Sequence, residues 1–408
     1  MTLSLESIDQ ARERLRGIIK PTPLMPSATL SRMLDADVLL KLENLQRTGS
    51  FKLRGAYNRV ATITPDEAAH GVIAASAGNH GQALAYAATR AGVKATIVMP
   101  RTAAIAKIDA TRSYGQQVIL EGANYQEARA AAWALGQRNG ALFVDAYDDP
   151  FVIEGQGTIG LEIADETNAD VMLVPVGGGG LLAGIALALA ERSPNTEVIG
   201  VEASGSPQLS VSLAADAPSA ISSPVDTIAD GLATGRIGRL PYEIIRAHVH
   251  RSIAVNDFEI GEAVLLMLER MKLVAEGAGA AALAGALKLK PELRGKRVVV
   301  CISGGNIDIN LLDRIISHGL AQAGRLVRLG ISLHDRPGEL QKLLALVSES
   351  GANVHSIGHD RSRRDVPITG ALVEMELETR GPDHVNEVLR RLEQNGYVVE
   401  TPPSPTRR

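Results

Sequence analysis

The sequence around one lysine could make its amine reactive. Lys52 stands in the run GSFKLRGA, directly after Phe51, between the strand-like run DVLLKLE and a helical segment. A lysine that loses hydration in an apolar, glycine-flanked loop has a lowered pKa, and its neutral amine can form a Schiff base with an aldehyde. Most lysines are solvated surface charges, so Lys52 becomes a candidate only through the residues that accompany it.

Four consecutive glycines, Gly177 to Gly180, separate the apolar run VMLVPV from the helical run LLAGIALALA. Their backbone is free to wrap a phosphate, and the N-terminus of the following helix favours an anion. A plain turn does not require four glycines, because each costs backbone entropy. The Lys and Ser/Thr of a nucleotide P-loop do not follow, so we expect a single phosphomonoester.

Two further loops supply polar groups at predicted strand ends. ASAGNHGQ, residues 75–82, offers Ser76, Asn79, His80 and backbone N–H groups to a carboxylate, although ordinary helix capping is the alternative. In CISGGNID, the Ser303 hydroxyl can bond a ligand ring nitrogen without holding it protonated, and a simple turn serine is the alternative. A lysine, a phosphate cradle, a carboxylate loop and a ring-facing hydroxyl together match the needs of pyridoxal phosphate.

The elements that must position these groups alternate along the chain. From residue 70, short β-branched runs alternate with alanine-rich helical runs, which predicts a doubly wound α/β fold with a parallel sheet covered on both faces. In such sheets, ligands bind beyond the carboxyl ends of the strands, where these loops lie. After about residue 320 the pattern becomes βαββαβ, which predicts a second domain over 326–402 with its boundary near SHGLAQAGR.

Composition excludes several classes of protein. The 408 residues, 45% of them hydrophobic, can bury a large core, and the net charge of −4 gives no electrostatic case for nucleic acid or an anionic membrane. No run approaches the roughly 20 apolar residues of a membrane span. The single cysteine, Cys301, cannot form an internal disulfide, and the charged N-terminus does not resemble a signal peptide, so we expect a cytoplasmic protein with a small-molecule partner.

In this order and at these separations, SFKLRGA, SAGNHGQ, VPVGGGGLLAG and SGGNID resemble the motifs of the threonine/serine dehydratases, or ammonia-lyases, among the fold-type II pyridoxal phosphate enzymes. The resemblance runs over about residues 5–320. It implies a catalytic domain over 1–320, with a smaller subdomain at about 52–150 inserted in a larger one and the cofactor in the cleft. It also implies β-elimination of L-threonine, and of L-serine, to 2-oxobutanoate or pyruvate and ammonia by a homodimer or homotetramer, with isoleucine biosynthesis as one metabolic setting.

The same resemblance implies a role for each motif residue. Lys52 would carry the cofactor and take the substrate's Cα proton, and an unprotonated ring nitrogen beside Ser303 would favour elimination. The cofactor contacts would be Phe51, Lys52, Asn79, Gly177, Gly178, Gly179, Gly180, Leu181 and Ser303. The substrate carboxylate would lie against Ser76, Ala77, Gly78, Asn79 and His80, with Ser76 joining Lys52 as a catalytic residue.

The 326–400 region resembles an ACT domain, an amino-acid-binding regulatory module. HDRPGEL matches its first strand-to-helix turn, where Asp335 and Gly338 would meet an effector such as isoleucine or valine. A passive dimerisation module is the alternative, and the sign of the regulation stays open.

Other functions compete with this interpretation. A serine racemase would have a serine where this chain has Ala77, and a hydroxyaspartate dehydratase of the same fold is a second alternative. The divalent-cation site of racemase-like members would begin at Glu202, but the aspartate expected six residues later is Gln208. GQGTIG satisfies the dinucleotide pattern G-x-G-x-x-G, although it lacks a preceding core strand, and close helix packing is its alternative. A catalytically idle amino-acid sensor is the remaining possibility.

Overall fold

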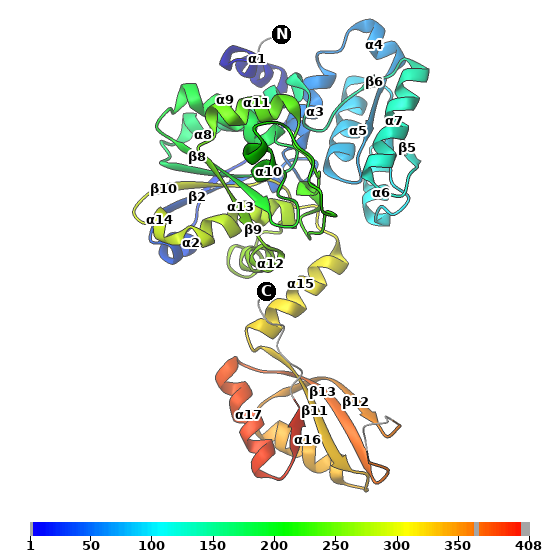
Figure 1. Cartoon of the computed structure of the whole chain (residues 1–408), viewed down its shortest axis with the longest axis vertical. Helices are drawn as coiled ribbons and strands as arrows, with labels where there is room; N and C mark the ends of the chain where they lie inside the picture. Colours follow the sequence, from blue (N-terminus) through cyan, green and yellow to red (C-terminus); the bar gives the residue numbers. More distant parts are fainter. Residues whose placement is uncertain (1–2, 363–366, 401–408) are drawn as a thin grey trace. The chain divides into compact units, whose positions relative to one another are not determined.

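The computed structural model describes residues 3–362 and 367–400 (Figure 1). The chain divides into two compact units, Met1–Leu311 and Leu312–Arg408, with the division inside helix α15 (Ile309–Gln322). Residues 401 and 402 of the predicted C-terminal domain lie outside the described residues.

The first unit contains a sheet of six strands. Their order is β1 (Leu24–Pro26), β2 (Asp37–Leu42), β10 (Arg297–Ile302), β7 (Val171–Pro175), β8 (Glu197–Ala203) and β9 (Arg251–Val255). Every neighbouring pair is parallel except β1 with β2. The central strands β7 and β10 are almost entirely buried, as expected for parallel strands covered on both faces. This architecture confirms the predicted doubly wound α/β class.

A second sheet of the same unit is formed entirely by chain between β2 and β7. Its order is β5 (Gln117–Leu120), β4 (Ala95–Met99), β3 (Val72–Ala75) and β6 (Leu142–Phe143), and all its pairs are parallel. The α-helices between β2 and β6 are α3 (Lys52–Val60), α4 (Pro65–His70), α5 (Asn79–Ala91), α6 (Ile105–Arg112) and α7 (Tyr125–Asn139). Of the apolar run ALFVDAY, residues 141–147, only two residues form β6, and the residues that follow form a loop that approaches Lys52.

Helices cover both faces of the larger sheet (Figure 1). On one side lie α1 (Leu5–Leu15), α8 (Pro150–Glu166), α9 (Gly180–Arg192) and α11 (Arg239–His248). On the other lie α2 (Ala28–Leu34), α12 (Asp257–Leu266), α13 (Gly277–Lys288) and α14 (Lys290–Leu293). The short elements η1 (Glu43–Leu45), α10 (Gln208–Ala215), η2 (Asp230–Leu232) and η3 (Met267–Met271) complete the unit. The sequence pattern does not predict α11, β9 or α12.

The glycines of GQGTIG lie inside helix α8, not in a strand-to-helix turn. A Cβ at Gly155 would lie 2.5 Å from the carbonyl oxygen of Arg54, and one at Gly157 would lie 3.0 Å from that of Gly184. The dinucleotide interpretation therefore has no structural basis here, and the glycines permit close packing of α8 against α3 and α9.

The second unit is a four-stranded antiparallel sheet with two helices. In chain order its elements are β11 (Leu326–His334), α16 (Glu339–Glu349), β12 (Asn353–Asp360), β13 (Gly370–Glu378), α17 (Pro382–Gln394) and β14 (Val398–Glu400), so the βαββαβ prediction is confirmed. The sheet order is β12-β13-β11-β14. Its core joins Ile331 and Val373 of the sheet to Leu343 and Val388 of the helices.

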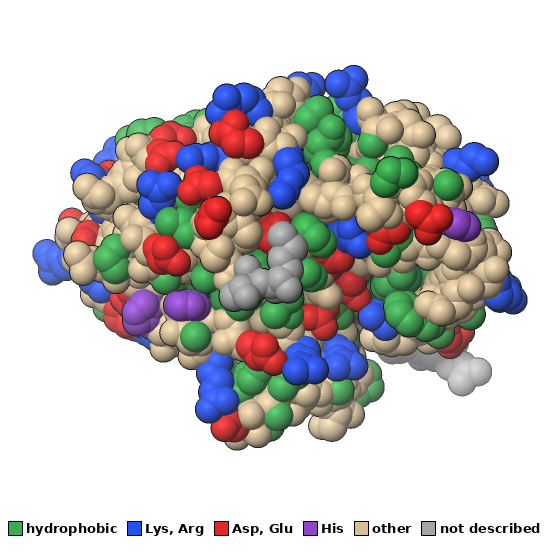
Figure 2. All heavy atoms as spheres, turned by 90° about the horizontal axis from the view of Figure 1, so that it is seen from above, with side chains coloured by type: hydrophobic (Ala, Val, Ile, Leu, Met, Phe, Trp, Pro, Cys, Tyr) green, Lys and Arg blue, Asp and Glu red, His purple; other side chains and the backbone are tan. Residues whose placement is uncertain are grey.

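Charges of both signs are distributed over the surface. Figure 2 shows Lys and Arg side chains interspersed with Asp and Glu over the face that it presents, in keeping with the small net charge. Within residues 3–362 and 367–400, no helix is long and apolar enough to cross a bilayer.

Candidate active site

The predicted motifs meet around one cavity of about 350 Å³ in the first unit. Lys52 begins α3, the 75–82 loop joins β3 to α5, the four glycines join β7 to α9, and Ser303 follows β10. The carboxyl ends of parallel strands thus bring these loops together, as the doubly wound pattern predicts. The cavity lining includes Phe51, Lys52, Ser76, Ala77, Gly78, Asn79, His80, Gly177, Gly178, Gly179, Gly180, Leu181 and Ser303.

The Lys52 amine has a backbone carbonyl as its hydrogen-bond acceptor. Its Nζ donates to the carbonyl oxygen of Ala146 at 2.8 Å and lies 5.1 Å from the centroid of the Phe51 ring. Desolvation lowers the pKa of Lys52 to about 8, although the charges of Asp145 and Glu276 oppose the shift. A large fraction of this amine is therefore neutral, and nucleophilic, in mildly alkaline solution.

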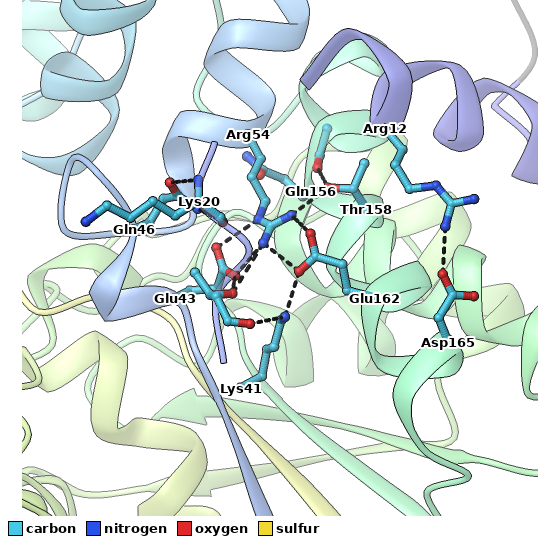
Figure 3. A network of polar contacts seen from close by, with 12 residues as sticks. Arg12, Lys20, Lys41, Glu43, Gln46, Arg54, Gln156, Thr158, Glu162 and Asp165 are labelled. Carbon is cyan, nitrogen blue, oxygen red and sulfur yellow. Dashed lines mark hydrogen bonds and ion pairs between the residues drawn. The ribbon is translucent and has the colours of Figure 1, made fainter. Parts of the chain in front are cut away.

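An ion network anchors helix α3 two residues beyond Lys52 (Figure 3). The fully buried Arg54 guanidinium donates from Nε and Nη2 to the Glu43 carboxylate at 2.9 and 2.7 Å. It also donates from Nη1 and Nη2 to Glu162 at 2.6 and 2.8 Å, and Lys41 Nζ donates to Glu162 at 2.6 Å. Two cations and two carboxylates are thus paired between β2, η1, α3 and α8, which fixes the helix that starts at Lys52.

The glycine loop is packed too tightly for side chains. Gly179 has φ of +94°, a conformation that favours glycine, and it is the N-cap of α9. A Cβ at Gly178 would lie 2.2 Å from Cγ of Tyr147, and one at Gly177 would lie 2.9 Å from the carbonyl oxygen of Gly231. The N–H groups of the first turn of α9 have no intrahelical acceptor, so this end of the cavity is suited to an anion.

The 76–80 loop also faces the cavity with a helix N-terminus. The Ser76 hydroxyl accepts the Gly78 N–H at 3.2 Å, and α5 begins at Asn79. A Cβ at Gly78 would meet nothing within 4 Å, so the cavity is open beside it. The backbone N–H groups that open α5 therefore border free space that an anionic group could fill.

The His80 imidazole is neutral in this environment. Desolvation, with the Lys52 charge, lowers the pKa of His80 to about 4. Its Nε2 lies 3.1 Å from the carbonyl oxygen of Val144, and its buried Nδ1 has no hydrogen-bond partner among the described residues. The neutral ring donates from Nε2 to that carbonyl, so it offers an anion no positive charge.

Asn79 is oriented by two residues whose role the sequence did not reveal. Its Nδ2 donates to Glu276 Oε1 at 2.5 Å, and its Oδ1 accepts from Asn306 Nδ2 at 2.8 Å. Glu276, in EGAGA, lines the cavity and Asn306 belongs to SGGNID. Desolvation raises the pKa of Glu276, although its bond to Asn79 opposes the shift. The three side chains tie the 76–80 loop to the Ser303 loop.

An ion pair links the two sheets' loops at the edge of the cavity. Lys107 of α6 donates to Asp230 of η2 at 2.8 Å, and both residues line the cavity. Their side chains are 18% and 65% exposed, which places Asp230 toward solvent. No sequence motif marked either residue.

Glu202 does not have the surroundings of a metal ligand. Its carboxylate accepts the N–H groups of Leu209 and Ser210 at 2.9 and 3.1 Å and the hydroxyl of Ser210. Across the described part of the chain, no cluster of three His, Cys, Asp or Glu side chains could hold a metal ion. Glu202 therefore caps helix α10.

The lowered pKa of Lys52 predicts a measurable pH dependence. The rate at which cofactor-free protein takes up pyridoxal phosphate should rise with pH and level off a little above pH 8, because the neutral amine is the form that reacts. A solvated lysine would give a rise that continues toward its ordinary pKa of about 10.4. Stopped-flow absorbance from pH 6 to about 10.5 distinguishes these two profiles.

Comparison with known proteins connects this geometry to a family. Residues 15–304 match the model of the family described as pyridoxal-phosphate dependent enzymes. The chain is 46% identical to an L-threonine ammonia-lyase of Thermotoga maritima over 398 residues, 97% of this chain and 99% of that one. It is 44% identical to an L-threonine ammonia-lyase of Geobacter sulfurreducens over 397 residues, 96% and 98% of the two chains.

Solved structures give the same result for the fold. The processed form of threonine deaminase isoform 2 from Solanum lycopersicum aligns with a TM-score of 0.73 at 34% identity, covering 76% of this chain and 93% of that one. Serine racemase from Dictyostelium discoideum aligns with a TM-score of 0.71 at 35% identity, covering 76% of this chain and all of that one.

Proposed function

This chain belongs to the family of pyridoxal-phosphate dependent enzymes, and from that premise we propose that it is an ammonia-lyase that converts L-threonine to 2-oxobutanoate and ammonia. L-Serine, which would give pyruvate, is its second substrate. The proposal rests mainly on one observation: Lys52, the glycine loop and Ser303 line the same cavity. The chain also matches two L-threonine ammonia-lyases over nearly its whole length.

The residues around the cavity fit pyridoxal phosphate. Lys52 is desolvated and has no carboxylate within ion-pair distance among the described residues, so its amine can react with the cofactor aldehyde. The tightly packed glycine loop at the start of α9 offers N–H groups to the phosphate. The Ser303 hydroxyl makes only a long bond of 3.4 Å to the Ala278 carbonyl oxygen, and it can turn to a ring nitrogen.

When bound, the cofactor supplies an aldehyde that reacts with amines and a ring that withdraws electrons from the substrate's Cα. The protein's residues do the remaining work. Lys52 Nζ, whose pKa is lowered by desolvation to about 8, is the base that removes the Cα proton. Ser76 and the N–H groups that open α5 hold the substrate carboxylate, with His80 supporting the loop as a neutral ring. Asn79, fixed by Glu276 and Asn306, bonds the cofactor's phenolic oxygen.

The position of Ala77 favours elimination over racemisation. Racemisation needs a proton donor on the face of Cα opposite to Lys52, and the alanine side chain has no proton to give. The similarity to serine racemase therefore supports the fold and the cofactor more strongly than that activity.

The charges around the cavity favour substrates with uncharged side chains. The cationic side chains in its lining are Lys52, which the cofactor uses, and Lys107, which Asp230 neutralises. Glu276 adds a further carboxyl group. The second carboxylate of 3-hydroxyaspartate would have no free cation, so the dehydratase of that substrate is the weaker alternative.

Asp230→Asn is expected to shift this preference. Freed from its partner, the Lys107 ammonium should raise kcat/KM for 3-hydroxyaspartate relative to threonine by about tenfold, about 1.4 kcal/mol, the scale of a hydrogen bond to a charged group. Steady-state kinetics on both substrates measure the ratio. The double variant Lys107→Gln with Asp230→Asn is the control and should show no gain. If the ratio of the two kcat/KM values is unchanged in Asp230→Asn, neutralisation of Lys107 by Asp230 does not set the substrate preference.

The proposed activity has a direct assay. Purified holoenzyme should release 2-oxobutanoate and ammonia in equal amounts from L-threonine, and pyruvate and ammonia from L-serine. Release of neither 2-oxo acid by a protein that carries the cofactor would instead favour a sensor or another reaction of the family.

We also propose that the second unit is an ACT-type regulatory domain. Its βαββαβ order and its Gly338, which has φ of +92° and open space where a Cβ would lie, support the proposal. Asp335 lies on the same turn and pairs with Arg361 at 3.0 Å. The effector we propose is a branched-chain amino acid, and the enzyme we propose is a cytoplasmic homodimer or homotetramer.

Gly338→Asp is expected to remove the effector response while leaving basal activity within about twofold, because the added carboxylate would fill the open space and repel an effector's carboxylate. The measurement is threonine turnover with and without isoleucine or valine. Gly381→Asp, at another open glycine of positive φ in this unit, serves as the control. A Gly338→Asp protein with its full response would place the effector elsewhere.

A further inference from the structure

A buried glutamine joins the two loops that form the phosphate side of the cavity. Gln208, at the start of α10, has no exposed surface. Its Nε2 lies 3.3 Å from the carbonyl oxygen of Val176 and 3.2 Å from that of Gly177, both directly after β7. The same nitrogen lies 3.2 Å from the carbonyl oxygen of Leu232, the last residue of η2. One amide nitrogen thus lies within hydrogen-bond distance of three backbone carbonyl oxygens.

The geometry on either side shows why this contact matters. Gly177 and Leu232 both line the cavity, and a Cβ at Gly177 would lie 3.0 Å from the Leu232 Cα. The two loops are therefore in close contact, and their carbonyl oxygens converge on one point. Three converging carbonyl dipoles repel one another unless a positive group lies between them, and the Gln208 N–H groups supply it. The Gln208 oxygen is held in turn by the Ser206 hydroxyl at 2.5 Å.

Carbonyl oxygens and carboxylates are also the ligands that a hard divalent cation prefers, and the buried Glu202 carboxylate caps the helix that Gln208 begins. This chain does not fit such an ion. The nitrogen of Gln208, a donor that cannot ligate a cation, faces the carbonyls, and the Glu202 carboxylate is already occupied by the N–H groups of Leu209 and Ser210 and by the Ser210 hydroxyl. The expectation of a possible cation at Glu202 therefore disagrees with the donor set.

We propose that Gln208 is a positioning residue whose amide takes the place of a cation, holding the glycine loop against the 230–234 loop so that the phosphate cradle forms without divalent metal. The inference rests on the family's cofactor binding at this loop. It concerns the cofactor's retention, and it does not depend on which amino acid is the substrate.

The test follows release of the cofactor from the full-length holoenzyme, monitored by loss of visible absorbance on dialysis. Gln208→Met, which keeps the volume and removes the amide, should release pyridoxal phosphate at least about tenfold faster, because the carbonyl oxygens of Val176 and Gly177 lose their donor and that of Leu232 keeps only the Thr234 N–H. Ser212→Ala is the matched control. Ser212 is equally buried on the same helix but bonds to Ser219, and its variant should stay within about twofold of wild type. Unchanged release from Gln208→Met would overturn the proposal.

The second part of the test measures how divalent cations change the rate of cofactor release. Wild-type release should be the same in EDTA and in magnesium or calcium chloride, and faster release in EDTA would contradict the proposal. Gln208→Glu replaces the donor with a carboxylate that completes a cation site, so its release should be fast in EDTA and slowed by calcium or magnesium. This variant keeps the test informative if Gln208→Met does not fold, and a Gln208→Glu protein indifferent to both cations and EDTA would count against the role. A wild type that binds no pyridoxal phosphate would refute the proposed function itself.

Discussion

A Lys52→Ala protein is expected to lose the visible absorbance of its cofactor and at least about a thousandfold in kcat/KM for threonine. The loss is large because one amine has two roles, binding the cofactor and acting as the general base. Removal of a general base alone costs about 10² to 10⁴ in rate. The amine is desolvated, bonded to the Ala146 carbonyl oxygen and surrounded by the predicted cofactor groups. Absorbance spectra and steady-state kinetics on the same preparation measure both effects.

Lys107→Ala is the control for this experiment, since it removes the other lysine of the cavity lining. It should keep the absorbance band, because the Lys107 ammonium is paired with Asp230 and is not needed for the covalent link. Loss of the band in Lys107→Ala, with its retention in Lys52→Ala, would move the cofactor to a different lysine.

The largest effect on stability is expected from Arg54→Met. The change leaves the buried Glu43 carboxylate without its cation and leaves Glu162 with Lys41 alone, and breaking such a buried pair costs about 3–5 kcal/mol. Burial opposes ionisation of Glu162, yet Arg54 and Lys41 hold its pKa below the ordinary value. Urea unfolding of the holoenzyme at fixed cofactor concentration measures the loss.

The matched control is an ion pair at the protein surface. Arg12 and Asp165 form a 2.8 Å pair with side chains 37% and 52% exposed (Figure 3), so Arg12→Met should cost less than about 1 kcal/mol. Because Arg54 helps to hold the pKa of Glu162 below its ordinary value, protonation of Glu162 removes that part of the wild type's advantage. The difference in unfolding free energy between Arg54→Met and wild type should therefore narrow as the pH falls below the ordinary glutamate pKa of about 4.3. Equal and small losses of unfolding free energy in both variants would mean that the buried network does not anchor α3.

The meeting of the motif residues around one cavity could be predicted from the sequence, because local composition marks these residues. Lys52, the glycine run and Ser303 are separated by more than 100 residues, yet the rule that parallel strands present their carboxyl ends at one edge was enough to bring them together. The βαββαβ order of the second unit was equally evident, because its strands and helices differ in hydrophobic period.

The parts that the sequence did not reveal depend on contacts between ordinary residues. Lys107 and Asp230 are 123 positions apart, and neither lies in a recognisable motif. Gln208 stands where the family resemblance implies an aspartate, but its three carbonyl partners depend on how β7 and η2 pack, which residue type does not encode. The neutral state of His80 likewise depends on burial, which residue type does not encode.

One false signal has a similar cause. The glycines of GQGTIG satisfy a loop pattern because close helix packing and close approach to a phosphate both exclude a side chain. Only the surrounding element separates the two, and here the glycines lie within α8.

The central claim is that Lys52 is the residue that holds the cofactor, and chemical trapping tests it most directly. Holoenzyme is reduced with borohydride, digested and examined by mass spectrometry. We expect the peptide containing Lys52 to carry the added mass of the reduced pyridoxyl phosphate group. Recovery of that mass on a different lysine, or of an unmodified Lys52 peptide from protein that retains the visible band, would contradict it.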